Sequence, residues 1–579
     1  RYDDALTDFN RAIEIDPEYI WAITGRGQTY HAMKRYDDAL TDHNRAIEID
    51  PEYTWAITGR GQTYHAMKRY DDALTDHNRA IEIDPEHAWA ITGRGQTYRA
   101  TERYDDALTD FNRAIEIDPK YTWAITNRGQ TYHAMERYDD ALTDHNRAIE
   151  IDPEYTWAIT GRGQTYRATE RYDDALTDFN RAIEIDPKYT WPITNRGQTY
   201  HAMERYDDAL TDYNRAIEID PEYTWAITGR GQTYHAMKRY DDALTDYNRA
   251  IEIDPESVRA ITSRGQTYHA MERYDDALTD HNRAIEIDPE NPRIITSRGQ
   301  TYHAMERYDD ALTDYNRAIE IDPESVRAIT SRGQTYHAME RYDDALTDHN
   351  RAIEIDPENP RIIAIRGEIN LLIGRYDEAL SDLNRAIGIS PEQSSFITNR
   401  GETYRLTGRY GEALNDFNRA IEIDSKSAWA MISRGQTYRA MKRYNEALVD
   451  FNRAIKISPN DGWIWLELAV IFRLLGKGSD EFKSWRKAEE TFTAQSTGNG
   501  IGAQRNRFNL CTLWCARSEW EKATSGLRNE LSKNPPMGLI RGASLDLRDM
   551  QRTLALDEGR TMIILRMLET CMPTPPDNV

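Results

Sequence analysis

The stretch RYDDALTDFNRAIEIDP, residues 1–17, returns along the chain with small changes at an interval of 34 residues. The later copies begin at Arg35, Arg69, Arg103, Arg137, Arg171, Arg205, Arg239, Arg273, Arg307, Arg341, Arg375, Arg409 and Arg443. A fixed period of this size is typical of a stacked array of one supersecondary unit, and not of a globule with one closed core. Residues that stand out in one unit therefore stand out because they are repeated.

The chain is acidic over most of its length. Its 579 residues include 73 Lys and Arg against 98 Asp and Glu, which gives a formal net charge of −25. Residues 477–579 contain 15 basic and 13 acidic residues, a net charge of +2, so residues 1–476 carry −27. An acidic array repels phosphate groups, so we expect a protein or peptide partner and no nucleic acid.

Cysteine usage and hydropathy bear on where the chain resides. Its three cysteines, Cys511, Cys515 and Cys571, all come late, which argues against a disulfide framework and fits a reducing, cytoplasmic compartment. No apolar run approaches the length of a membrane span, so we expect no membrane insertion. No signal peptide is visible. Because the chain starts at Arg1 in the middle of a repeat and lacks an initiator Met, we expect further sequence upstream.

One unit, residues 20–53, predicts two helices. In its first half, apolar and small residues from Ile23 to Tyr30 follow the i, i+4, i+7 spacing of one helical face. Its second half carries a similar apolar stripe and ends at Pro51, because the residue before Pro is pushed out of the α region. Only Lys34 and Arg35 separate the halves, a link so short that the helices must form an antiparallel pair.

This unit resembles the tetratricopeptide repeat. The family's pattern of small, aromatic and proline residues is matched by Gly27, Tyr30, Ala39, His43, Ala46 and Pro51. The unit departs from that pattern at Ile23, where an aromatic residue is usual, and at Arg26, where Leu is usual. The resemblance implies an all-α fold, an α-solenoid in which antiparallel helix pairs stack into a right-handed superhelix.

The resemblance also implies four stretches along the chain. Residues 1–19 would be the second helix of a truncated repeat, and residues 20–461 would be thirteen tandem units. Residues 462–535 read as degenerate repeats. Residues 536–579 predict helices that cap the open end of the stack, followed by a poorly ordered tail.

In this family the first helices line a concave groove, and positions 2, 5, 9, 12 and 13 face a ligand that is usually an extended peptide or a helix. With Ile20 as position 1, position 2 is Trp in seven successive units and Arg in the next four, position 9 is mostly Gln, and position 12 is His or Arg. The predicted ligand-binding residues are Trp21, Trp55, Trp89, Trp123, Trp157, Trp191, Trp225, Arg259, Arg293, Arg327, Arg361, Gln28, Gln62, His31 and His65.

The change from Trp to Arg indicates a groove with two chemistries. The aromatic half suits apolar, proline-rich or cationic side chains, and the arginine half suits carboxylates or phosphates. A row of large exposed aromatic residues is unusual unless something covers it. The alternative is that each Trp packs on a neighbouring helix and stiffens the superhelix.

The fourteen histidines also follow the repeat, and they do not predict a metal site. Eight lie at position 12, where stacked helices about 10 Å apart are too distant for two rings to share one ion at about 2 Å each. Five lie at position 24, where other units have Phe or Tyr, which favours packing. Gly25-Arg26-Gly27 lies inside a predicted helix, so it is not a phosphate loop. We expect no cofactor, no metal and no catalytic set, and hence no enzyme.

The resemblance leads to two candidate functions. The first is a non-enzymatic scaffold that binds a peptide or protein segment in the groove. The second is a C-terminal recognition arm of a larger bacterial signalling protein with an NTPase or protease-like effector upstream, because the RGQTY…RAIEIDP style resembles such arrays. The family's chaperone-tail clamp uses Lys at position 5 and Asn at position 9, where this chain has Thr24 and Gln28, so we do not expect that ligand. Near-identical units could also pair between chains, so self-association stays open.

Overall fold

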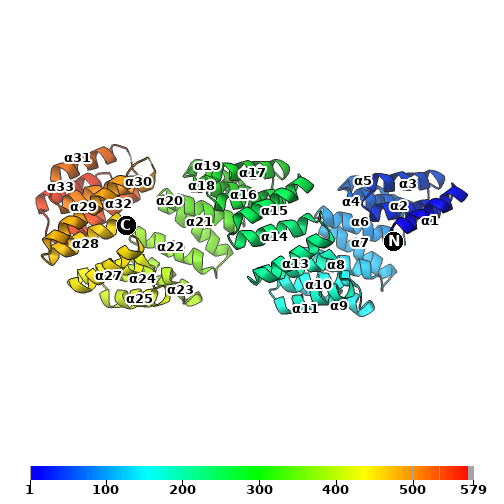
Figure 1. Cartoon of the computed structure of the whole chain (residues 1–579), viewed down its shortest axis with the longest axis horizontal. Coiled ribbons are helices and arrows are strands. Elements are labelled where there is room, and N and C mark those ends of the chain that lie inside the picture. The colour runs from blue at the N-terminus through cyan, green and yellow to red at the C-terminus, as the bar shows by residue number, and fades with distance from the viewer. Residues whose placement is uncertain (1, 499, 534, 572–579) are drawn as a thin grey trace, which may run out of the picture. The chain divides into compact units, whose positions relative to one another are not determined.

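A computed structural model gives the fold of residues 2–498, 500–533 and 535–571. These described residues form the helices α1 to α33 and no β-strand (Figure 1), which confirms the predicted all-α class. The helices group into two compact parts, called here unit 1 (Arg1–Thr267) and unit 2 (Tyr268–Val579). The predicted tail lies outside the described residues except for Cys571.

The helices of unit 1 are α1 (Tyr2–Ile15), α2 (Ile20–Ala32), α3 (Tyr36–Ile49), α4 (Thr54–Ala66), α5 (Tyr70–Ile83), α6 (Ala88–Ala100), α7 (Tyr104–Ile117), α8 (Thr122–Ala134), α9 (Tyr138–Ile151), α10 (Thr156–Ala168), α11 (Tyr172–Ile185), α12 (Thr190–Ala202), α13 (Tyr206–Ile219), α14 (Thr224–Ala236) and α15 (Tyr240–Ile253). The boundary between the units falls inside α16 (Val258–Ala270).

The helices of unit 2 are α17 (Tyr274–Ile287), α18 (Pro292–Ala304), α19 (Tyr308–Ile321), α20 (Val326–Ala338), α21 (Tyr342–Ile355), α22 (Pro360–Leu372), α23 (Tyr376–Ile389), α24 (Ser394–Leu406), α25 (Tyr410–Ile423), α26 (Ala428–Ala440), α27 (Tyr444–Ile457), α28 (Gly462–Leu474), α29 (Gly478–Gln495), α30 (Ile501–Ala516), α31 (Trp520–Leu531), α32 (Met537–Leu554) and α33 (Glu558–Glu569).

Each repeat turns between its two helices at a residue in the left-handed conformation. After α2 this residue is Lys34, with a φ of 58°. The next residue, Arg35, donates its backbone N–H to the Tyr30 carbonyl at 2.9 Å, and its guanidinium lies 4.4 Å from the centroid of the Tyr30 ring. Glycine is the usual residue at such a helix end, and Lys or Glu takes its place in ten successive repeats. Three later repeats have glycine there, at Gly374, Gly408 and Gly476, whereas Lys442 keeps the left-handed turn with a φ of 62°.

The first helices of neighbouring repeats form the inner layer of each unit. In unit 1, α2 contacts α4, α4 contacts α6, and the series continues to α14; in unit 2, α22, α24, α26 and α28 do the same. Among the described residues from α1 to α31, second helices of neighbouring repeats make no comparable contact. Helices on the tighter side of a curved stack lie closer together, so the first helices supply the inner face and the second helices the outer face.

Glycine allows the helices to approach around the residue at position 24. A Cβ on Gly27 would lie 2.8 Å from Cε1 of His43, and one on Gly59 of the next repeat would lie 2.7 Å from the same atom. Both distances are too short for a carbon side chain, so the two glycines leave the space that the imidazole fills. His43 is 0% exposed, which confirms its predicted packing role.

A buried ion pair stands where the repeat family usually has Leu. Arg26 of α2 donates from Nε and Nη2 to the two carboxylate oxygens of Asp42 in α3, at 2.7 and 2.6 Å, and from Nη1 to Oδ1 of Asn10 in α1 at 2.7 Å. Asp42 is only 3% exposed. The hydrogen bond to Asp42 raises the pKa of Arg26 despite its partial burial. One guanidinium therefore joins three successive helices, an arrangement called here the Arg–Asp–Asn clamp.

The clamp leads to a prediction about stability. In the repeat at residues 122–155, changing Asp144→Ala leaves the half-buried Arg128 without its carboxylate. We expect the free energy of unfolding to fall by about 3–5 kcal/mol. The matched control is Asp140→Ala, which removes an exposed Arg–Asp pair with Arg137 in the same repeat, and we expect it to cost about 0–1 kcal/mol. Urea unfolding followed by circular dichroism measures the free energy of unfolding of both variants. Equal losses of stability would contradict the role given to the clamp.

Candidate functional site

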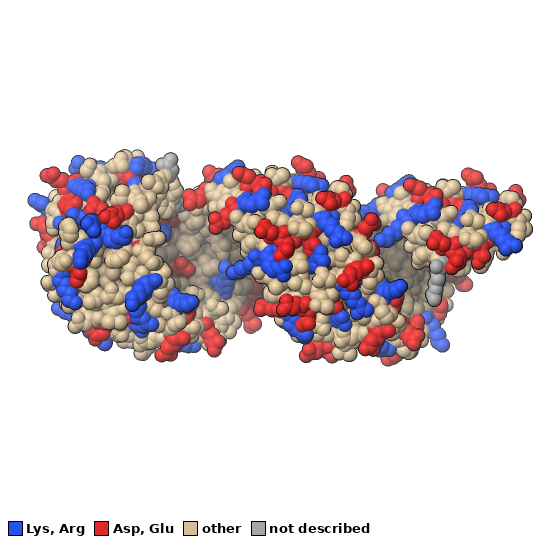
Figure 2. Space-filling view, viewed as in Figure 1, with Lys and Arg blue, Asp and Glu red and all other residues tan. Residues whose placement is uncertain are grey.

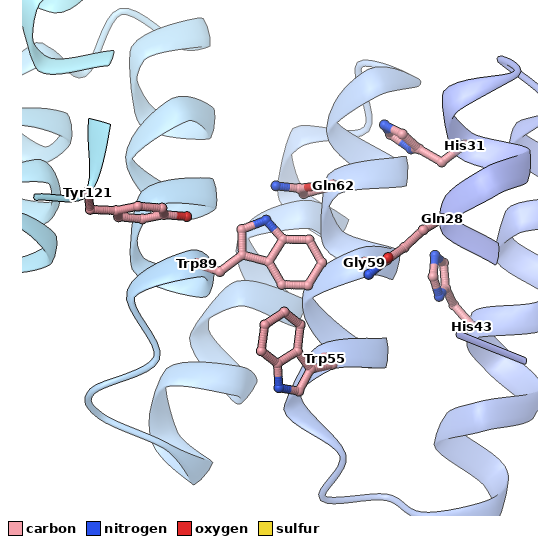
Figure 3. Close-up of a pocket in the computed structure, with 8 residues that line it drawn as sticks. All are labelled: Gln28, His31, His43, Trp55, Gly59, Gln62, Trp89 and Tyr121. Carbon is pink, nitrogen blue, oxygen red and sulfur yellow. The ribbon is translucent and has the colours of Figure 1, made fainter. Parts of the chain in front are cut away.

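Side chains from positions 2, 9 and 12 line shared cavities on the inner face of unit 1. One cavity of about 420 Å³ is lined by Gln28, His31, His43, Trp55, Gly59, Gln62, Trp89 and Tyr121. Figure 3 shows the rings of Trp55 and Trp89 side by side, with Tyr121 on one side and Gln28 on the other. A second cavity, of about 660 Å³, includes Trp21, Gln28, Tyr53 and Trp55 in its lining. The structure thus gathers the predicted residues of the first repeats around common hollows.

The seven tryptophans of the predicted row do not share one environment. Trp21, Trp55 and Trp225 are exposed by 63%, 50% and 46%, whereas the four between Trp55 and Trp225 are half-buried. The rings of Trp55 and Trp89 are 5.2 Å apart between centroids, and Trp123, Trp157 and Trp191 each lie against the Tyr two residues earlier. Packing between neighbours therefore accounts for the middle of the row, and the exposed rings lie towards its ends.

The arginines that follow the tryptophans also differ from one another. The Arg259 guanidinium lies 4.1 Å from the centroid of the Trp225 ring and donates to Oε1 of Gln232 at 2.8 Å. Arg327 makes the equivalent bond to Gln300 at 2.8 Å. Burial lowers the pKa of Arg259. Arg293 and Arg361 are exposed on unit 2.

The histidines at position 12 bridge successive repeats. Nδ1 of His31 lies 3.1 Å from the Thr63 hydroxyl, and Nδ1 of His65 lies 3.1 Å from that of Thr97. Burial lowers the pKa of His31 and, with help from the charge of Arg99, lowers the pKa of His65 to about 4. These rings are therefore neutral near pH 7. Within the described part of the chain, no three His, Cys, Asp or Glu side chains are placed to hold a metal ion.

In unit 2 a helix of the same chain lies against the inner face. Arg439, at position 12 of its repeat, donates to Oδ2 of Asp549 at 2.5 Å and to the Thr553 hydroxyl at 2.7 Å, both in α32. It also lies 3.2 Å from the carboxylate of Glu467 in α28. Burial opposes the charge of Arg439, but the carboxylates of Glu467 and Asp549 outweigh that effect and raise its pKa.

The same helix helps to enclose a cavity of about 570 Å³ between repeats and C-terminal helices. Its lining includes Gln334, His337, Glu340, Glu368, Arg505 and Asp546. Glu340 and Tyr342 reach the start of α32, where Oε2 of Glu340 lies 2.0 Å from the place a Cβ on Gly538 would take. The sequence predicted helices that close the end of the stack, but it did not predict that α32 would contact residues at positions 9 and 12 of the repeats.

Comparisons with known proteins agree with this geometry. The tetratricopeptide repeat family matches residues 20–53, 53–120, 121–188, 155–222, 189–256, 223–290, 326–359, 360–393 and 392–460, and a TPR repeat description matches residues 299–340. The chain therefore belongs to the tetratricopeptide repeat family. No curated protein matches the sequence.

A solved structure shows the same fold at low sequence identity. The crystal structure of the APC/C hetero-tetramer Cut9-Hcn1 matches with a TM-score of 0.53 and 14% identity, over 80% of this chain and 92% of that one. Its identity is too low to carry more than the α-solenoid fold, which it confirms. Together, the repeats and the fold define a protein-interaction scaffold. None of the helices described here is both long and apolar enough to cross a membrane.

The buried histidines at position 24 lead to a prediction about acid stability. Burial lowers the pKa of His77 and His145 to about 3, whereas an unfolded His titrates near ~6.5. The folded pKa is the lower one, so stability is unaffected above pH ~6.5 and falls as the pH drops from there towards 3. Changing both residues to Phe, which fills the equivalent place at Phe111, should reduce this loss by up to about 1.4 kcal/mol per pH unit for each histidine.

Urea midpoints at pH 7 and pH 5 for wild type and for His77→Phe/His145→Phe measure the effect. Phe111 sits 2.7 Å from a Cβ placed on Gly95, much as His77 sits 2.9 Å from one on Gly61, so Phe fits the site. The same shift with pH in both proteins would show that these imidazoles do not set the acid sensitivity.

Proposed function

We propose that unit 1 binds a peptide or protein segment along its inner face, with the exposed tryptophans as the main contacts. The cavity in which Trp55 and Trp89 meet Gln28, Gln62 and His31 supports this most directly. Trp offers a large, rigid contact area and is enriched at binding hot spots. The neighbouring Gln side chains offer amide donors and acceptors to a backbone that passes over them.

The proposed function is binding of the segment alone, with no chemical step. Unit 2, taken by itself, offers contacts for carboxylates through its position-2 arginines, because Arg293 and Arg361 are exposed. A cytoplasmic location is part of the same proposal, supported by the free thiols of Cys511, Cys515 and Cys571. The alternative drawn from the sequence, a recognition arm of a larger signalling protein, would use the same inner face, so one experiment tests the step that the two share.

The experiment is a selection of displayed 16-residue peptides on the full chain. We expect the enriched peptides to bind wild type and to lose about 30-fold or more in affinity for Trp55→Ala/Trp89→Ala, because truncating hot-spot aromatics costs about 2 kcal/mol or more. Phe482→Ala in α29 is the control, since Phe482 is 67% exposed but belongs to unit 2.

Stability measurements separate binding from packing. Trp55 is half exposed, and the half-buried Trp89 packs on the rings of Trp55 and His87. The double variant should therefore keep its helical signal and melt within a few degrees of wild type. Peptides that bind the double variant as well as wild type would refute the proposal. A double variant that unfolds far more easily would favour the alternative in which the tryptophans stiffen the stack.

A further inference from the structure

The inner face of unit 1 carries no negative charge in an otherwise acidic array. The first helices α2, α4, α6, α8, α10, α12 and α14 contain no Asp or Glu. The acids of each repeat lie on the second helix and the links, for example at Asp37, Asp38 and Glu48 of α3. Figure 2 shows Asp and Glu mainly on the ridges of the visible surface, whereas its hollows are lined mostly by uncharged residues.

Two arginines project from this face with only neutral partners. Arg99, at position 12 of its repeat, donates to Oε1 of Gln130 at 2.7 Å and lies 3.5 Å from the Asn127 carbonyl. Arg167, two repeats further along, donates to Oε1 of Gln198. Among the described residues neither guanidinium forms an ion pair, and Arg259 forms none either. Burial lowers the pKa of Arg99 to about 10 and also lowers the pKa of Arg167, where the nearby charge of Arg259 adds to the effect.

A cavity opens beside Arg99. It has a volume of about 300 Å³, and its lining includes Arg99, Tyr104, Gln130, His133, Gln164 and Trp191. Gln130 is the partner of Arg99, and Gln164 lies three residues before Arg167 on α10. The space therefore adjoins Arg99 and reaches one member of the tryptophan row, Trp191.

In unit 2, α32 lies in the groove, and an arginine at position 12 there has carboxylate partners. Arg439 is the counterpart of Arg99, and Glu467 stands where Asn127 stands beside Arg99. In addition, Asp549 of α32 reaches into the groove and pairs with Arg439 at 2.5 Å. The pKa of Arg439 is raised by these carboxylates, against its burial, whereas the pKa of Arg99 is lowered. The same residue at the same position thus has carboxylate partners in one unit and none in the other.

We propose that unit 1 binds an acidic segment of a partner protein, whose carboxylates pair with Arg99 and Arg167 as Asp549 pairs with Arg439. This inference rests on the proposed function and adds the charge of the ligand to it. Arg99 and Arg167 lie two repeats apart, so the segment spans at least three repeats. The site differs from the chaperone-tail clamp, because positions 5 and 9, which carry that clamp, are Thr92 and Gln96 in the repeat of Arg99.

The test is the content of Asp and Glu in the peptides that are selected on the full chain. We expect the pool enriched on wild type to be rich in Asp and Glu, and its members to bind at least about tenfold more weakly to Arg99→His/Arg167→His. Histidine is the residue at position 12 in most other repeats, such as His133 and His201, where it bonds to a Thr of the next repeat. The double variant should therefore fold normally, which its melting curve will check.

The matched control is Lys120→Gln/Lys188→Gln. It removes the same charge from the same two repeats, but at exposed residues in the links before α8 and α12. We expect the acidic peptides to bind this control as they bind wild type. Replacing Asp and Glu by Asn and Gln in the best peptide should weaken its binding to wild type and leave its binding to Arg99→His/Arg167→His unchanged.

Two results would overturn the inference, and they differ in what they leave standing. If the enriched peptides depend on Trp55 and Trp89 but carry no excess of acidic residues, or bind the arginine variant equally well, the ligand is not acidic and the proposed function stands. If no enriched peptide depends on either the tryptophans or the arginines, both the inference and the proposed function fail.

Discussion

The Arg–Asp–Asn clamp is the interaction on which the stack depends most. Arg26, Asp42 and Asn10 belong to three different helices, and the clamp recurs through the array to Arg434, Asp450 and Asn418. Breaking a buried pair leaves a buried charge without its partner. Each copy of the clamp therefore raises the free energy of any displacement of a helix from its neighbours. A leucine at the same position would add apolar contact. It could not fix the orientation of one helix against the next, as a bidentate guanidinium does.

The clamp works together with the glycines around position 24. Because Gly27 and Gly59 have no Cβ, the first helices of adjacent repeats close on the His43 ring from both sides. The first helices then contact each other directly, which places positions 2, 9 and 12 on the inner face. The packing around position 24 and the clamp between the layers thereby decide which residues a partner can reach. His43 and Gly59 also line the candidate cavity themselves.

The period of 34 residues and the apolar spacing in one unit predicted the helix pairs and their order. The inner position of the tryptophans was implied by the resemblance to the tetratricopeptide repeat. Local signals of this kind suffice when each contact lies within a repeat or between neighbours. Three features escaped prediction. The partner of Arg26 could not be assigned, because Asp38 and Asp42 are both acids on the same helix. The division of the tryptophans into exposed and packed residues depends on ring contacts such as that of Tyr121 with Trp123. The docking of α32 joins Arg439 to Asp549 over 110 residues, and no periodic pattern encodes such a pair.

The left-handed turns between the helices have a mechanical consequence. Lys or Glu holds a φ near 58–59° at this turn from Lys34 to Glu340, at a cost of about 1–2 kcal/mol for each residue. Gly374, Gly408 and Gly476 occupy the same place without that cost. Under a pulling force, the hairpins that end in Lys or Glu should yield before those with glycine. The array would then lengthen by opening one hairpin after another, while the hairpins turned by Gly374, Gly408 and Gly476 stay closed.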